Sequence, residues 1–247
     1  MNKINVVDNK IIPFDNTDVI LNNNIITFTN NGDYYLEYIT SDNVNITINI
    51  EDNVCVQLFE YSNNNDINTN ITYNLGKNSS LIISKFYYND NTNEEINIYL
   101  NKKNANIKYN FSSISKNHDN YLINIYHNDS TTNSDIFNRT IAKENSSNNF
   151  DINSYVENKI LDCYLNQSTK IITLGDSNNK INPNMFTHDN SVTAIHASVI
   201  GNVNEEELFY LMSRGISYNE AIKIIIKGII LSNINPNMEY REKILNI

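Results

Sequence analysis

The side chains that could carry chemistry are few, and the four histidines come first. They are His118, His127, His188 and His196. Nucleophilic hydrolysis needs a serine or cysteine in a turn beside a histidine base, which an acid in turn orients. Asp189 lies near His188 and His196 in the sequence, but no Gly-x-Ser-x-Gly turn accompanies them. The pattern therefore predicts no nucleophilic active site.

Metal binding is not predicted by spacing alone. The histidines show neither an HExxH pattern nor a pair four residues apart, the arrangements that place zinc ligands on a helix. Cys55 and Cys163 lie far apart in strand-like segments without a CxxC pair, which favours a reducing, cytoplasmic location. The neighbours of Cys163 indicate a small buried apolar residue.

Paired carboxylates could hydrolyse glycosides, and in a β-helix such acids come from coils distant in sequence. Asp66, Asp90 and Asp129 lie in Asn-rich stretches, which we interpret as solvated turns. We therefore predict a protein that is not an enzyme. A β-solenoid carbohydrate-binding or carbohydrate-active protein is the alternative.

Several other classes of function are excluded by composition. The chain of 247 residues has a net charge of −10, with no basic cluster beyond Lys102–Lys103, so nucleic-acid binding is not expected. Walker A and dinucleotide fingerprints are absent. No apolar run approaches the roughly 20 residues of a membrane span, and no signal-peptide core follows the first residues.

The elements that must position any site are short strands. From Ile4 to about Ile200 apolar and polar residues alternate, with Ile, Tyr and Phe on one face and Asn, Thr, Ser and Lys on the other. The clearest alternating segments are 45–50, 68–75, 96–100, 106–111 and 122–126. Polar clusters between them are typical of turns.

This pattern predicts a mainly β body but leaves two architectures open. A sandwich or barrel usually uses Gly and Pro in tight hairpins, and the chain has only six Gly and three Pro. Asn can adopt the left-handed conformation that such turns need. Asn-rich corners between evenly spaced strands equally fit a parallel β-helix.

After Gly201 the pattern becomes helical. Asn204 caps a first helix with Glu at its third position, and Gly215 ends that helix in a left-handed conformation. Ser217 and Glu220 form a second capping box, and Asn235-Pro236 is expected to start a third helix. Apolar residues occupy more than one face of the second helix, which favours a partner interface over simple packing on the β body.

The junction between strands and helices resembles the C-terminal signature of the SufB/SufD family of iron–sulfur cluster assembly proteins. The resemblance is carried by Ile195–Gly201 (IHASVIG) and by Glu206–Ile216 (EELFYLMSRGI), followed by a helix with Ala221. Upstream, residues 166–174 (NQSTKIITL) and 182–185 (NPNM) are similar to family segments. The similarity is strong over about 160–230 and weak over 120–160.

The resemblance implies a right-handed parallel β-helix of residues 1–201 followed by a helical domain of residues 202–247. It implies a scaffold that pairs through its β-helix, with a SufB/SufD paralogue or with itself. The helices would dock a SufC-type ABC ATPase, and a transient iron–sulfur cluster would form at the subunit interface without being bound stably. The ATPase-binding residues implied are Leu208, Phe209, Tyr210, Leu211, Arg214, Gly215, Ile216, Ile222 and Ile226.

The same resemblance makes His196 a candidate ligand of iron or sulfur at the interface, because imidazole is a good iron ligand. The structural alternative is a hydrogen-bonded histidine that positions the switch to helix. For Arg214 a contact with Glu205–Glu207 is favoured over a catalytic role. The segment 173–179 lacks the cysteine of SufB-type members, so the resemblance favours a SufD-like chain, and a SufB-like homodimer is the alternative.

Overall fold

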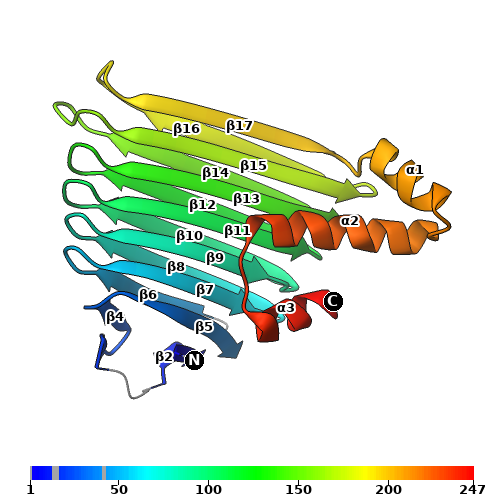
Figure 1. Cartoon of the computed structure of the whole chain (residues 1–247), viewed down its shortest axis with the longest axis horizontal. Coiled ribbons are helices and arrows are strands. Elements are labelled where there is room, and N and C mark those ends of the chain that lie inside the picture. Colours follow the sequence, from blue (N-terminus) through cyan, green and yellow to red (C-terminus); the bar gives the residue numbers. More distant parts are fainter. Residues whose placement is uncertain (1, 13–16, 41–42) are drawn as a thin grey trace.

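The computed structural model describes residues 2–12, 17–40 and 43–247, in which a long series of strands precedes three helices (Figure 1). The strands are β1 (Asn2–Val7), β2 (Lys10–Ile11), β3 (Val19–Asn22), β4 (Ile25–Phe28), β5 (Gly32–Thr40), β6 (Asn43–Ile50), β7 (Cys55–Ser62), β8 (Asp66–Leu75), β9 (Ser80–Tyr87), β10 (Asn91–Leu100), β11 (Asn106–Ser115), β12 (His118–His127), β13 (Asn133–Lys143), β14 (Ser147–Val156), β15 (Tyr164–Leu174), β16 (Asn178–Phe186) and β17 (Thr193–Asn202). The helices are α1 (Glu205–Ser213), α2 (Tyr218–Asn233) and α3 (Met238–Leu245).

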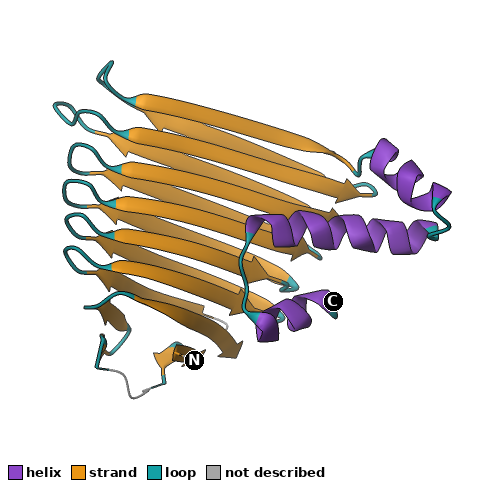
Figure 2. Ribbon diagram, in the orientation of Figure 1, coloured by secondary structure: helices purple, strands orange, loops and turns teal. Residues whose placement is uncertain are grey.

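The strands coil into a solenoid with two parallel sheets (Figure 1, Figure 2). Sheet A has nine strands in the order β17-β15-β13-β11-β9-β7-β5-β1-β2, and sheet B has eight in the order β16-β14-β12-β10-β8-β6-β4-β3. From β5 onward each strand pairs in parallel with the strand two places later in the chain. Parallel pairing confirms the β-helix and excludes the antiparallel sandwich.

The coils lengthen along the chain. Asn74 bonds to Asn49, which is 25 residues earlier, whereas Asn148 bonds to Asn179, which is 31 residues later. A solenoid with coils of unequal length has no fixed repeat length in its sequence. The alternation of apolar and polar residues was therefore the pattern from which its strands could be predicted.

The core lies between the two sheets, because alternate residues of each strand point inward. In β8 the buried residues are Ile67, Thr69, Ile71, Tyr73 and Leu75, and the residues between them lie outside. The same alternation recurs in β14, and the inward residues form one continuous apolar cluster from β1 to β15. The predicted period of two is therefore the period of solenoid packing.

Asparagines occupy the corners for two physical reasons. Asn53, Asn78 and Asn104 adopt left-handed backbone conformations, with φ of 64°, 53° and 61°, as the shortage of glycine predicted. Their side chains also bond from coil to coil, since Asn78 and Asn104 each donate an amide to the asparagine one coil earlier at 2.9 Å. The Asn-rich turns are thus hydrogen-bonded ladders and not only solvated loops.

The helix termini largely follow the predicted signals. Asn204 accepts hydrogen bonds from the amides of Glu206 and Glu207, and Ser217 forms a capping box with Glu220. Gly215 has φ of 86°. Its N–H bonds to Met212 and that of Ile216 bonds to Leu211, which is a Schellman motif.

The predicted start of the third helix was wrong by two residues. Asn237, and not Asn235, accepts from the amide of Tyr240, so α3 begins at Met238 and Pro236 precedes the cap. An asparagine next to the first helical residue offers a side-chain acceptor for the free helical amides, whereas the proline can only avoid adding another free amide.

Helices α2 and α3 cover part of the outer face of sheet A (Figure 1). Ile230, Ile234, Tyr240 and Ile244 are buried there in a second apolar cluster. The sheet contributes Phe59, Tyr61, Phe86, Ile114, Ile141 and Ile172. This packing fixes α2 on the solenoid and leaves α1 projecting beside the last coil.

The two ends of the solenoid differ. At the N-terminal end the short strands β2 and β3 pair antiparallel with β1 and β4, so the edge strands there are only two and four residues long. At the other end β16 and β17 are the edge strands of sheets B and A. The described part of the chain places no further strand on either of them.

Candidate functional site

The last coil presents two open strand edges, and His196 lies on one of them. β17 pairs through Thr193–Asn202 with β15 on one side only, within the residues that the structure describes. An unpaired edge offers a row of N–H and C=O groups to another strand. The side chains of this strand are exposed almost throughout, so no part of the described chain covers them.

His196 occupies an inward-pointing position. Its register partner is Gln167, and the same column of the sheet continues through Ile136 and Tyr109. In every earlier coil such a residue is enclosed by the next coil. His196 is exposed because no coil follows.

Beneath His196 lies a buried amide with an unused acceptor. Gln167 is only 1% exposed, and its Nε2 donates to Ser154 Oγ at 2.8 Å and to the carbonyl of Asn184 at 3.2 Å. Its Oε1 has no hydrogen-bond partner among the described residues. A buried acceptor without a donor costs about 1–3 kcal/mol, so this position favours a donor arriving from the open end.

Apolar side chains also lie along the open strand β17. Ile195, Val199 and Ile200 are each about half exposed. On sheet B a stack of aromatic rings runs along the solenoid with centroid spacings near 5 Å and ends at exposed Phe186. Its members are Tyr99, Tyr126, Tyr155 and Phe186. The outer ring thus has a partner on one face only within the described chain.

Helix α1 forms a second exposed surface. None of its residues is buried, and Phe209 is 75% exposed. Tyr210 is also exposed, and the guanidinium of Arg214 lies 5.3 Å from the centre of its ring. Arg214 therefore faces this ring, and not the favoured partners Glu205–Glu207. An amphipathic helix with aromatic residues in water is typical of a surface that meets a partner.

The other residues predicted to bind an ATPase divide into two groups. Leu208 and Ile222 line a cavity of about 1180 Å³ between the helices and the end of sheet A. Ile226 packs against the apolar cluster beneath α2. Leu211, Gly215 and Ile216 form the Schellman turn between α1 and α2. Only part of the predicted set is therefore on the open surface.

The described residues hold no group of three or more His, Cys, Asp and Glu side chains arranged to bind a metal ion. Asp189, near His196 in sequence, accepts from the amide of Ser191 at 2.8 Å, and this bond holds the pKa of its carboxyl below the usual value. The carboxylate of Asp189 therefore stabilises the loop in which it lies. Within the described part of the chain, His196 therefore belongs to no such group.

The three turn acids also have structural partners. Asp66 accepts from Asn91 at 2.5 Å, Asp90 pairs with Lys116 at 2.8 Å, and Asp129 accepts from the amide of Lys103 at 2.9 Å. Each links neighbouring coils. These contacts argue against a pair of catalytic carboxylates and against the carbohydrate-active alternative.

Cys163 is 2% exposed, as its sequence neighbours predicted. Its Sγ lies 3.3 Å from Thr132 Oγ1, which also bonds to His127 Nδ1 at 2.8 Å, and His127 Nε2 bonds to Ser134 Oγ at 3.0 Å. Burial lowers the pKa of His127 to about 4, so the ring is neutral at pH 7. The cluster is enclosed and satisfied, which identifies it as a structural one.

Sequence reasoning missed the polar residues inside the solenoid. Gln167 and Lys85 occupy inward positions between apolar neighbours, and such an interruption of the apolar face was the available signal. It also missed Tyr218, which extends the exposed apolar surface of α1 and α2. None of the helices in the described chain has the length and hydropathy needed to cross a membrane.

Comparison with known proteins gives a consistent family signal. A family model described as "SUF system FeS cluster assembly, SufBD core domain" matches residues 21–229. The chain is 27% identical over 118 residues to the iron–sulfur cluster assembly protein SufD of Bacillus subtilis (strain 168), which is 47% of this chain and 27% of that protein.

Two shorter matches lie in the same family. A SufBD family protein of Pyrococcus horikoshii is 54% identical over 35 residues, 14% of this chain and 8% of that protein. The SufBD family protein ycf24 of Galdieria sulphuraria is 44% identical over 46 residues, 19% of this chain and 21% of that protein. The matched segments thus span about a quarter or less of the length of these relatives.

Proposed function

The chain belongs to the SufB/SufD family of iron–sulfur cluster assembly proteins, and on this basis we propose that it is a non-catalytic scaffold subunit of a Suf-type assembly complex. The scaffold would join a second SufB/SufD-type subunit through the last coil and a SufC-type ABC ATPase through its C-terminal helices. The single observation that supports this most is the open coil of β16 and β17, with His196 at its inward side.

The pairing surface is the open end of the solenoid. Ile195, Val199 and Phe186 expose apolar area beside unpaired strand edges, and both features favour association with another strand-bearing surface. The edge strands at the opposite end, β2 and β3, are only two and four residues long. A complex built this way joins two solenoids end to end, and very short edge strands at the far ends disfavour further strand pairing.

His196 would then lie at the centre of the subunit interface. Its imidazole is a suitable ligand for iron, and its other nitrogen needs an orienting acceptor. The unpaired Oε1 of Gln167, one coil below, supplies an acceptor in the same inward column. The remaining ligands of a nascent cluster come from the second subunit, and the cluster leaves as product.

The ATPase-docking surface would be α1 with the start of α2. Phe209 and Tyr210 supply exposed aromatic area, and Arg214 extends the polar rim of the same helix. Aromatic residues and arginine are enriched among residues that dominate binding energy in interfaces. The Schellman turn at Gly215 holds α1 at a fixed angle to α2, which is anchored on sheet A.

Co-purification with a SufC-type ATPase tests the docking surface. Deleting residues 204–247 removes it, but also uncovers the apolar outer face of sheet A. A paired exchange, Phe209→Asp with Tyr210→Asp, leaves that packing in place and should abolish co-purification. Met238→Asp, equally exposed on α3, is the matched control. Retention of the ATPase by the α1 variant would contradict this docking assignment.

Pairing is tested separately by mass measurement of the purified chain, alone and with a SufB/SufD paralogue. Val199→Lys places a charge at the open edge and should prevent association. Ile20→Lys, at an exposed position of β3 near the opposite end, should leave it unchanged. Association of the chain alone indicates a homodimer, whereas association only with the paralogue indicates a heterodimer. Association that survives Val199→Lys would place the interface elsewhere.

A further inference from the structure

The aromatic stack on the outer face of sheet B runs in the direction in which strands are added to the sheet. Its members Tyr99, Tyr126, Tyr155 and Phe186 occupy one register column from β10 to β16. Neighbouring ring centroids are 4.8–5.1 Å apart, and neighbouring ring planes differ by 10–12°. This spacing is the separation of about 4.8 Å between adjacent strands, so each strand contributes one ring to the stack.

Phe186 presents a ring face to the position of an additional strand. One face stacks on Tyr155, and because the two planes are nearly parallel, the other face points away from Tyr155 toward the open edge of sheet B. Phe186 is 48% exposed, whereas Tyr126 and Tyr155, with a ring on each side, are only partly exposed. A further strand in the same register would place its side chain about 5 Å from this face.

An asparagine ladder beside the rings also ends at β16. Each side-chain amide donates to the asparagine one coil earlier, Asn124 to Asn97 at 3.1 Å, Asn153 to Asn124 at 3.0 Å and Asn184 to Asn153 at 3.0 Å. Because all the donors point the same way, Asn184 Oδ1 remains an acceptor without a hydrogen bond in the described chain. The position two residues before Phe186 therefore calls for an N–H donor on the next strand.

The charge on the same face of β16 is positive. Lys180 lies on this outer face, four residues before Asn184, and is exposed beside its neutral register partner Asn149. It forms no ion pair among the described residues. A carboxylate on a facing strand would complement this charge, and such complementarity contributes to the choice of partner.

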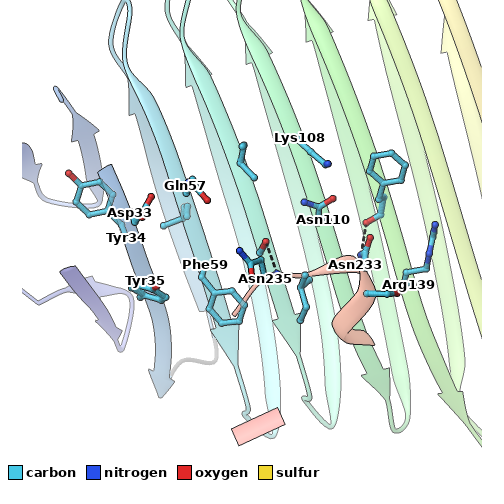
Figure 3. A pocket seen from close by; sticks show the side chains of 16 residues that line it. Asp33, Tyr34, Tyr35, Gln57, Phe59, Lys108, Asn110, Arg139, Asn233 and Asn235 are labelled. Atoms are coloured by element: carbon cyan, nitrogen blue, oxygen red, sulfur yellow. Dashed lines mark hydrogen bonds between the residues drawn. The ribbon is translucent and has the colours of Figure 1, made fainter. Parts of the chain in front are cut away.

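The outer face of sheet A differs, because the chain's own helices cover part of it. Asn233, the last residue of α2, donates to the carbonyls of Phe111 at 2.7 Å and Phe137 at 3.2 Å (Figure 3). These bonds hold the connector between α2 and α3 on sheet A. The aromatic stack lies on the opposite outer face of the solenoid, so a contact at Phe186 is separate from the surface proposed to dock the ATPase.

A second copy of this chain does not supply the missing ring. Two copies of β16 that pair about a twofold axis normal to the sheet run antiparallel, and full overlap places Asn182 on the axis. Asn184 then meets Lys180 of the second copy, which is a donor, but Phe186 meets Asn178. Pairing of β16 with β17 of a copy also brings no ring, since β17 contains no Phe, Tyr or Trp. A ring on Phe186 therefore has to come from a different chain.

We propose that the second subunit is a different chain whose edge strand extends sheet B from β16 and stacks an aromatic ring on Phe186. The same strand carries an N–H donor opposite Asn184 and a carboxylate opposite Lys180. A slip of two residues would keep the same sheet face outward but lose the ring pair, so the stack fixes the register of the two subunits. This inference rests on the proposed pairing through the last coil.

Affinity measurements of the full chain with a SufB/SufD paralogue test the ring contact. Phe186→Tyr keeps a ring and should leave the dissociation constant unchanged. Phe186→Leu keeps apolar area without a ring and should weaken binding about two- to tenfold, the contribution of an aromatic pair. Lys180→Glu should weaken binding at low salt and less at high salt. Leu122→Ala, at an exposed position two strands inside the edge of sheet B, is the matched control and should have no effect.

Fluorescence shows whether the second chain encloses this ring. The chain has no tryptophan, so Phe186→Trp adds a single indole to it, and the complex of the native chain gives the background. The emission should shift to shorter wavelength when the paralogue binds, because the exposed ring becomes enclosed.

Two kinds of failure are distinguishable. Association with unchanged emission, equal affinities of the native chain and Phe186→Leu, or self-association that Phe186→Leu weakens to the same degree would each overturn this inference and leave the pairing itself in place. Absence of any association by the native chain, or association that survives Val199→Lys, would contradict the pairing through the last coil and the ring contact with it.

Discussion

Two histidines point into the solenoid, one in an enclosed coil and one in the last coil. His127 lies between Leu100 and Val156 in its column and is 1% exposed, with both ring nitrogens hydrogen-bonded. His196 lies above Gln167 with no coil beyond it. The same inward position is therefore a sealed structural site in one coil and an open, chemically available site in the other.

Charged residues extend this difference between the enclosed coils and the last coil. Lys85 is fully buried with Glu60 and Glu94, at 3.2 Å and 2.5 Å. Tyr87 donates to Glu94 at 3.0 Å, and Tyr38 and Tyr73 donate to Glu60. Burial, followed by the nearby glutamates, raises the pKa of these tyrosines, so they remain donors.

The comparison teaches how enclosure by a further coil changes the surroundings of an inward-pointing polar side chain. The enclosed coils compensate their buried charges internally, because an unpaired charge there would destabilise the fold strongly. On the last coil His196 is exposed instead, and Gln167 Oε1 one coil below it, like Glu94 Oε2 and Asp119 Oδ1 in the enclosed coils, has no hydrogen-bond partner among the described residues. If the comparison is correct, substitutions in the enclosed coils change folding, whereas substitutions in the last coil change association and function.

The largest expected effect is that of Lys85→Met. It leaves Glu60 and Glu94 buried without their cation, and breaking a buried pair in this way costs about 3–5 kcal/mol. Urea unfolding followed by circular dichroism measures the loss. The matched variant replaces Lys85, Glu60 and Glu94 together by apolar residues and should lose less. If Lys85→Met lowers the free energy of unfolding by less than about 1 kcal/mol, the ion pairs of Lys85 with Glu60 and Glu94 do not stabilise the enclosed coils as described.

His127 should make folding stability depend on pH. The pKa of His127 is about 4 in the folded chain, and its ordinary value is 6.5. Between these pH values the unfolded chain therefore binds a proton at this histidine that the folded chain does not bind. Its contribution is complete above pH 6.5 and is lost as the pH falls toward 4, by about 3 kcal/mol in total.

The measurement compares urea unfolding at pH 7 and pH 4.5 for the native chain and for His127→Gln. The difference between the two proteins isolates the imidazole from other groups, such as Asp119, whose pKa burial raises to about 6 and whose effect has the opposite sign. Parallel pH profiles of the two proteins would show that His127 is not sealed as described.

An asparagine ladder allows the same residue type to be compared in both regions. Asn124 donates to Asn97 at 3.1 Å and accepts from Asn153 at 3.0 Å, whereas Asn184 on β16 donates to Asn153 at 3.0 Å. Asn124→Ala should therefore cost about 1–2 kcal/mol of unfolding free energy, and Asn184→Ala about half of that. If the two variants lose equal stability in thermal unfolding of the unassociated chain, the enclosed coils and the last coil do not differ in this respect.

Much of the solenoid could be predicted, because burial of apolar side chains on one face of each strand produces a simple alternating sequence pattern. The alternation in Asn68–Leu75 reflects burial on one side of a strand. Parallel strand pairing could not be predicted in this way, because coils of unequal length give the sequence no fixed repeat. Asn78 and Asn104, which bond from coil to coil, have the sequence pattern of ordinary turn residues. The family resemblance, and not periodicity, selected the β-helix.

The candidate site was predicted less completely, because exposure at the end of a solenoid is a property of the whole fold. His196 was identified through the resemblance, while Gln167, 29 residues earlier, became a neighbour only through coil register. Arg214 and Tyr210 lie four residues apart and could be paired from helical geometry.

The smallest expected effect on folding comes from His196→Ala. The side chain is exposed and has no hydrogen bond within the described residues, so unfolding free energy should change by less than about 0.5 kcal/mol. Cluster formation by the assembled complex, followed by visible absorption, should fall strongly if the imidazole takes part. Gln167→Leu separates the two roles, because it removes the acceptor below His196 but keeps the imidazole. If cluster formation falls partly with Gln167→Leu and fully with His196→Ala, the side-chain amide of Gln167 orients the imidazole of His196. Normal cluster formation with His196→Ala would mean that the last coil serves only for subunit pairing.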